Sequence, residues 1–83
     1  MITLYVLEGK KGRRYVGITN NLERRLSEHR LGSSRSGNLI GSFRLLHKES
    51  FPTYLAARQR EKFLKSGQGR EWLKQRFLRR NPP

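Results

Sequence analysis

The chain has 83 residues, 34% of them hydrophobic, and 19 Lys and Arg residues against 6 acidic ones give a formal net charge of +13. This length allows one domain with one modest core, and the lack of cysteine excludes disulfides, thiol nucleophiles and Cys-ligated metal centres. The charge indicates a polyanionic partner, with nucleic acid the first candidate, because released counterions drive such association.

The first part of the chain predicts a β-hairpin. Residues 2–8 and 13–19 read as strands, and the Gly-Lys-Lys-Gly run at 9–12 reads as the turn between them. A turn symmetric about Lys10 would place Tyr5 opposite Tyr15. Because side chains alternate along a strand, both tyrosines would then lie on one face. The other face would be filled by Ile2, Leu4, Val6, Val16 and Ile18.

The rest of the chain predicts three helices and one more strand. The helices are expected at 22–31, 53–65 and 70–78, and the strand at 43–51. On this strand Phe43, Leu45 and Phe51 share one parity. Residues 79–83 are expected to form a frayed basic tail. The order ββαβαα predicts an α+β fold, a small three-stranded antiparallel sheet flanked by helices, in a single domain spanning 1–83.

The first predicted helix carries two polar residues on the face expected to turn inward. Leu22, Arg25, Leu26 and His29 follow the i, i+3, i+4, i+7 spacing of one helical stripe. A charge there is costly without a partner. Arg25 could extend its charged end to solvent, and His29 could be a hydrogen-bonded histidine at the core edge. Since the two stand one turn apart and beside two tyrosines, the functional reading is favoured.

Glu61 is the acidic residue best placed to look inward. It shares a stripe of the second predicted helix with Ala57 and Leu64. The alternative is a surface ion pair with Arg58 or Lys65. Two tyrosines, an arginine, a histidine and one carboxylate in a basic domain would be suited to cleaving a phosphodiester.

Further basic residues would contact phosphates without reading base sequence. Gly17 would let substrate or metal approach the backbone closely. His47, Trp72 and Phe77 are read as structural. The candidate nucleic-acid contacts are Lys10, Lys11, Arg13, Arg14, Gly17, Arg35, Arg70 and Lys74.

These segments together resemble the GIY-YIG nuclease family over essentially the whole chain. The first motif is Thr3-Leu4-Tyr5, in which Thr and Leu replace the family's Gly and Ile, and the second is Tyr15-Val16-Gly17. Arg25 follows ten residues after Tyr15, and His29 four residues later, at the family's functional positions. Glu61 falls in the next conserved helix. The chain looks closest to the small stand-alone bacterial members.

The resemblance implies a role for each of these residues. Glu61 would hold one divalent cation, Mg²⁺ or Mn²⁺, and Arg25 would bind the scissile phosphate. Tyr5 is assigned as the general base, and Tyr15 would organise the water or the metal. His29 would hydrogen-bond a tyrosine or the phosphate.

The sequence therefore predicts a metal-dependent DNA endonuclease with little sequence specificity, with a role in DNA repair or recombination. One alternative is a nucleic-acid-binding module of the same fold with weak or no catalysis. Another is a subunit that gives a basic surface to a larger complex, so a protein partner that supplies specificity is also considered. RNA is not excluded as substrate. No signal peptide or apolar run of about 20 residues is recognisable, so we expect a cytoplasmic protein with no membrane partner.

Overall fold

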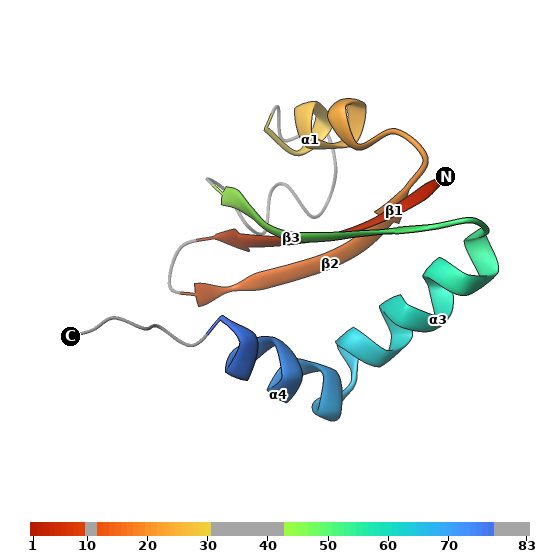
Figure 1. Cartoon of the computed structure of the whole chain (residues 1–83). Helices are drawn as coiled ribbons and strands as arrows, with labels where there is room; N and C mark the ends of the chain where they lie inside the picture. The colour runs from red at the N-terminus through yellow and green to blue at the C-terminus, as the bar shows by residue number, and fades with distance from the viewer. Residues whose placement is uncertain (10–11, 31–42, 78–83) are drawn as a thin grey trace.

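A three-stranded antiparallel sheet with helices on both faces makes up the fold (Figure 1). The computed structural model describes residues 1–9, 12–30 and 43–77. The strands are β1 (Ile2–Gly9), β2 (Arg14–Thr19) and β3 (Phe43–Phe51), in the spatial order β2-β1-β3. The predicted α+β class and the order ββαβαα are confirmed. Because β1 is central, β2 and β3 are both edge strands.

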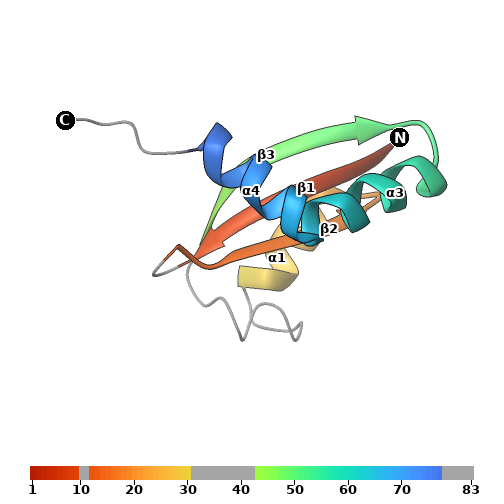
Figure 2. The same cartoon turned by 90° about the horizontal axis from the view of Figure 1, so that it is seen from below.

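One helix covers the first face of the sheet and two cover the second. Figure 1 shows α1 (Leu22–Arg30) on one side and both α3 (Tyr54–Lys65) and α4 (Gly67–Arg76) on the other. Figure 2 shows α3 and α4 lying across the sheet from below. Among the described residues, no helix is long and apolar enough to cross a membrane.

The hairpin register differs by two residues from the predicted one. Tyr5 pairs with Gly17, and Tyr15 pairs with Leu7. The N–H of Gly9 donates to the carbonyl of Arg13 at 2.7 Å. This hydrogen bond centres the turn on position 11, one residue later than the predicted centre at position 10. Gly12, with a φ of 73°, supplies the left-handed residue that such a turn needs. The predicted pairing was wrong, but the shift is even, so both tyrosines still lie on one face.

Phe43 and Phe51 share one parity in sequence, but they lie on opposite faces of the sheet. A register shift opposite Val6 and Leu7 interrupts the pairing of β3 with β1. An irregularity of this kind reverses the alternation of side chains beyond it. As a result Phe43 packs against the α1 side of the sheet and Phe51 against the α3 side, although they share a parity in sequence.

The helices begin and end mostly where capping residues predict. The side chain of Asn21 accepts the N–H of Arg24 at the start of α1. Thr53 caps α3, which ends at Lys65 as predicted. The last helix was predicted three residues too late, because Ser66 ends α3 and also caps α4. A Cβ at Gly69 would collide with the backbone of Phe63 and Leu64, so glycine allows the close approach of α4 to α3.

Two apolar clusters hold these layers together. One lies between the sheet and α3 and α4, around Leu4, Leu64 and Leu73. The other lies under α1, around Tyr5 and Leu7. The predicted filling of the face opposite the two tyrosines, which α3 and α4 cover, is confirmed for Leu4, Val6, Val16 and Ile18.

A polar and aromatic cluster joins β3 to the two later helices. Arg60 donates two hydrogen bonds to Glu49, at 3.0 and 3.1 Å, and its guanidinium lies 4.7 Å from the ring centroid of Trp72. The ring of His47 packs edge-on against Trp72 at 5.8 Å. Burial opposes ionisation of Glu49, but the hydrogen bonds from Arg60 and His47 hold the pKa of its carboxyl below the ordinary value. The cluster supports the structural reading of His47 and Trp72.

Candidate active site

Tyr5 is the centre of the candidate site. It comes from the middle strand, is only 1% exposed, and lies under α1. The Nε of Arg25 donates a hydrogen bond to the Tyr5 hydroxyl oxygen at 3.3 Å, and Nε2 of His29 lies 3.3 Å from the same oxygen. The predicted inward stripe of α1 is therefore confirmed: His29 is 1% exposed and Arg25 reaches the sheet.

The environment shifts the ionisation of all three groups. Burial raises the pKa of Tyr5 to about 12, although the hydrogen bond from Arg25 acts in the opposite direction. The hydrogen bonds to Tyr5 and Glu28 raise the pKa of Arg25, so this guanidinium stays charged. Burial, helped by the charge of Arg25, lowers the pKa of His29 below its ordinary value. A neutral imidazole next to a neutral phenol and a fixed cation is thus the resting state at neutral pH.

Arg25 is held from two sides. Besides its contact with Tyr5, it donates from Nη1 to Oε1 of Glu28 at 2.8 Å. Its side chain is still 30% exposed, so solvent and ligands can reach it. Arg24, the next residue, is 60% exposed, lies 3.8 Å from Glu28 and belongs to the solvent side of α1. The two adjacent arginines therefore provide a matched pair, one in the site and one outside it.

Tyr15 completes the aromatic part of the site from the edge strand β2. Its ring centroid lies 6.1 Å from that of Tyr5 and 5.2 Å from that of His29. Unlike Tyr5, it is partly exposed and lines a groove on the surface. The structure thus brings Tyr5, Tyr15, Arg25 and His29 together.

Gly17 has a role in this packing that differs from the expected one. A Cβ at this position would lie 2.6 Å from the Tyr5 hydroxyl and 3.1 Å from Cε2 of Tyr15. The space above Gly17 is therefore filled by the Tyr5 ring. The glycine makes room for a tyrosine of the site, rather than for substrate on that face.

Glu61 comes from α3, on the opposite face of the sheet from α1 (Figure 1). Its side chain is 14% exposed, with Oε1 3.2 Å from Nε of Arg58 and Oε2 3.0 Å from Nζ of Lys65. Both ion pairs that the sequence left open as an alternative are formed. Lys65 also lines the groove that Tyr15 lines. The ion pair with Lys65 thus connects Glu61 to the groove at the β2 edge. Glu61 approaches this edge from the face of the sheet opposite Arg25.

Comparison with known proteins identifies the family of the chain. The family model described as the GIY-YIG catalytic domain matches residues 1–75. The chain belongs to the GIY-YIG family. Membership of this family places it among nuclease domains that act on DNA.

A solved structure is similar to this chain in sequence and in fold. The UPF0213 protein of Bacillus halodurans, determined by solution NMR, is 31% identical, with a TM-score of 0.57. The match covers 93% of this GIY-YIG chain and 86% of that one. No curated protein sequence matches the chain.

The groove beside Tyr15 gathers some of the predicted nucleic-acid contacts of this GIY-YIG domain. Arg14, Arg70 and Lys74 all line it, together with Lys65. Lys65 was considered from the sequence only as a partner of Glu61. Lys65 is the last residue of α3, and Ser66 after it caps both α3 and α4. This position next to a helix junction is the sequence signal that could have indicated Lys65 as a groove residue. Arg13 is exposed beside the hairpin turn, whereas Lys10, Lys11 and Arg35 lie outside the described residues.

Proposed function

We propose that this chain is a metal-dependent endonuclease that hydrolyses phosphodiester bonds in DNA with little sequence specificity. The observation that carries the proposal is the fixed guanidinium of Arg25, held by Tyr5 and Glu28 yet 30% exposed beside Tyr15. A cation that is oriented before the reaction stabilises the charge that grows on a phosphate in the transition state without further reorganisation. Family membership supports the same activity.

Arg25 binds the scissile phosphate in this proposal. Its Nε donates to Tyr5 and its Nη1 to Glu28, and because a guanidinium has five N–H groups, further donors remain for a phosphate. Charge-assisted hydrogen bonds from a guanidinium to phosphate oxygens are among the stronger polar contacts. Glu28 and Tyr5 thus act as positioning residues for Arg25.

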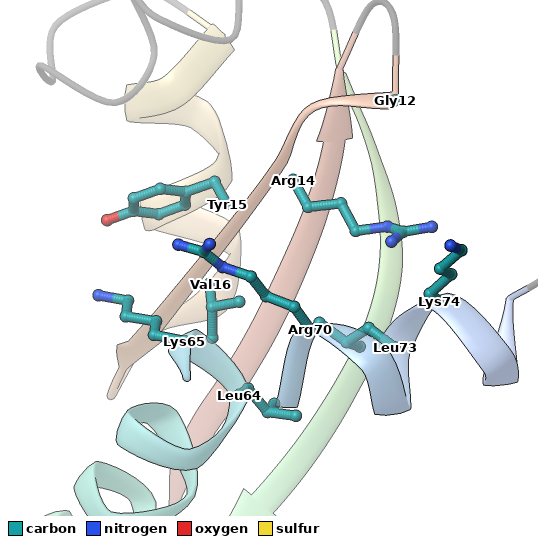
Figure 3. Close-up of a pocket in the computed structure, with 9 residues that line it drawn as sticks. All are labelled: Gly12, Arg14, Tyr15, Val16, Leu64, Lys65, Arg70, Leu73 and Lys74. Atoms are coloured by element: carbon teal, nitrogen blue, oxygen red, sulfur yellow. The ribbon is translucent and has the colours of Figure 1, made fainter. Parts of the chain in front are cut away.

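Tyr15, rather than Tyr5, accepts the proton of the attacking water. Tyr5 is buried and its raised pKa of about 12 makes its proton hard to remove, which argues against the role expected from the sequence. Tyr15 reaches the groove, and in Figure 3 the side chains of Lys65 and Arg70 extend toward it. In this role Tyr15 releases its own proton to solvent before the reaction, and its oxygen then accepts the proton of the attacking water.

The donor set fits one divalent cation, with Glu61 as its ligand. Among the described residues no group of three or more His, Cys, Asp or Glu side chains gathers at one place. Mg²⁺ is commonly held by one or two carboxylates, with waters and substrate phosphate oxygens completing its shell. The side chains that cover Glu61, Arg58 and Lys65, are 63% and 52% exposed and can swing away. A bound cation would supply Lewis-acid activation of the phosphate and the leaving oxygen.

A specific observation also favours a second candidate, a nucleic-acid-binding module with weak or no catalysis. Both oxygens of Glu61 already have cationic partners, as in an ordinary surface ion pair. If these pairs persist when DNA binds, the chain would retain its basic groove and lose its chemistry.

Cleavage assays separate the two candidates. The purified protein is incubated with single-stranded, duplex and branched DNA, and with RNA, in the presence of Mg²⁺, Mn²⁺ or EDTA. The proposed function predicts cleavage of DNA with either metal and none with EDTA. Binding of all substrates with no cleavage under any of these conditions would favour the binding module.

A further inference from the structure

A basic groove of about 630 Å³ runs between the edge strand β2 and the two helices α3 and α4 (Figure 3). Its wall begins at Tyr15, so it is continuous with the candidate active site. A groove of this size is in the range that encloses a small molecule, roughly 300–1,000 Å³. It is lined by Gly12, Arg14, Tyr15, Val16, Leu64, Lys65, Arg70, Leu73 and Lys74.

The groove carries positive charge that the described carboxylates neutralise only in part. Among the described residues, no carboxylate forms an ion pair with Arg70 or Lys74. Lys65 shares Glu61 with Arg58, and Arg14 lies 3.7 Å from Glu8, which also pairs with Arg44. Cationic side chains that lie this close together repel one another, and an anionic ligand would relieve the repulsion.

The cations stand at two places along the groove. In Figure 3, Lys65 and Arg70 extend toward Tyr15, whereas the ends of Arg14 and Lys74 approach one another farther along. Between them the floor is apolar, formed by Leu64, Leu73 and Val16, which are 1%, 2% and 6% exposed. Two cationic positions separated by an apolar floor match the order of a nucleic-acid strand, in which a sugar and base lie between successive phosphates.

We propose that this groove binds the unpaired nucleotide next to the scissile phosphate, so that the strand enters the site in single-stranded form. The phosphate nearer the site would meet Lys65 and Arg70, and the next one Arg14 and Lys74. The volume of about 630 Å³ is in the range of sites that hold one small ligand, which favours a single nucleotide over a base pair. The inference rests on the proposed function, because it places the same strand that passes Tyr15. Basic grooves that follow one backbone are a general means of binding single strands.

Binding in EDTA tests the groove without requiring cleavage. A fluorescently labelled single strand, a blunt duplex of the same sequence, and that duplex with an unpaired extension are titrated by anisotropy. The groove variant is Arg70→Gln with Lys74→Gln, and the control is Arg24→Gln with Lys62→Gln. Both remove two charges from exposed helical positions, and the control residues do not line the groove. Glutamine keeps helix propensity close to that of the parent residues, and circular dichroism checks folding.

The parent protein is expected to bind the single strand and the extended duplex more tightly than the blunt duplex. The groove variant should lose about tenfold or more on these two substrates relative to the control, and its salt slope should fall by about 2, one for each phosphate contact. Equal losses in both variants would overturn the proposal, as would tighter binding of blunt duplex by the parent. This binding assay contains no metal, so it does not depend on cleavage. If the groove variant binds more weakly than the control but the parent cleaves nothing in the cleavage assays, the proposed nuclease activity is wrong and the groove stands. Cleavage that does not change in the groove variant would count against the groove alone.

Discussion

The hydroxyl oxygen of Tyr5 lies 3.3 Å from Nε of Arg25 and is buried beneath α1. This contact ties the tyrosine of the first motif to the arginine that follows the second, across 20 residues of sequence. It makes Tyr5 a support for the guanidinium. The other motif tyrosine, Tyr15, is left to face the groove.

Replacing each motif tyrosine by phenylalanine should separate these two roles. Tyr15→Phe should lower the cleavage rate by about 100-fold or more, since it removes the proposed proton acceptor, and it should leave stability near that of the parent. Tyr5→Phe should cost about 1–3 kcal/mol of unfolding free energy, because the buried polar groups around it lose a partner. Its effect on cleavage should be smaller. Rates at saturating metal and urea unfolding of both variants check this, and a greater rate loss for Tyr5→Phe would return the base role to Tyr5.

Arg25 and Arg24 allow a test with adjacent residues of the same type. Arg25→Ala should lower cleavage by about 100-fold or more, the typical effect of removing one donor to transition-state charge, and it should weaken DNA binding as well. Arg24→Ala removes the same charge from the solvent side and should change turnover little. Steady-state kinetics on one labelled substrate compares them. Should Arg24 prove the more important of the two, the motif register assigned to α1 is wrong.

Gly17→Ala tests the packing of the tyrosines. The new methyl group would lie 2.6 Å from the Tyr5 hydroxyl, and that ring cannot move freely because Arg25 and His29 hold it. We expect a loss of about 1–3 kcal/mol in stability, the usual cost of overpacking, and a fall in cleavage as Arg25 is displaced. Thermal unfolding measures the first effect. A variant as stable as the parent would show that the Tyr5 ring is not fixed.

Acid should destabilise the protein through His29. Its pKa is lowered in the folded state by burial and by Arg25, while in the unfolded chain it titrates near the ordinary value of about 6.5. The unfolded state therefore binds more protons below that pH, and stability falls as the pH drops through about 6.5. The melting temperature of His29→Gln should fall less than that of the parent over this window. Equal falls would mean that His29 does not resist protonation.

The faces of the elements were predictable from sequence, but their exact pairing was not. Period-two alternation placed Tyr5 and Tyr15 on one face, and helical spacing brought Arg25 and His29 to it. The register depended on where Gly12 takes its left-handed φ, which composition does not determine. The register shift between β1 and β3, which places Phe43 and Phe51 on opposite faces, could not be predicted from the pattern of residues.

The groove was hidden for a different reason. Lys65, Arg70 and Arg14 come from three elements, and only the packing of α3 and α4 against β2 brings them to one place. That packing depends on Ser66 serving both helices and on Gly69 allowing close approach. Local patterns identify such residues as caps and turns, without giving the angle between the helices.

The measurement that tests the central claim most directly compares cleavage and binding in Glu61→Ala. Glu71→Ala is its control, because Glu71 is an exposed glutamate of α4 whose carboxylate accepts a hydrogen bond from Gln75. Glu61→Ala should lose metal-dependent cleavage by at least about 100-fold, while DNA affinity stays equal or rises slightly, as it should in the control, since one negative charge is removed. Cleavage by Glu61→Ala at the rate of the parent would contradict the proposed metal site and the mechanism built on it.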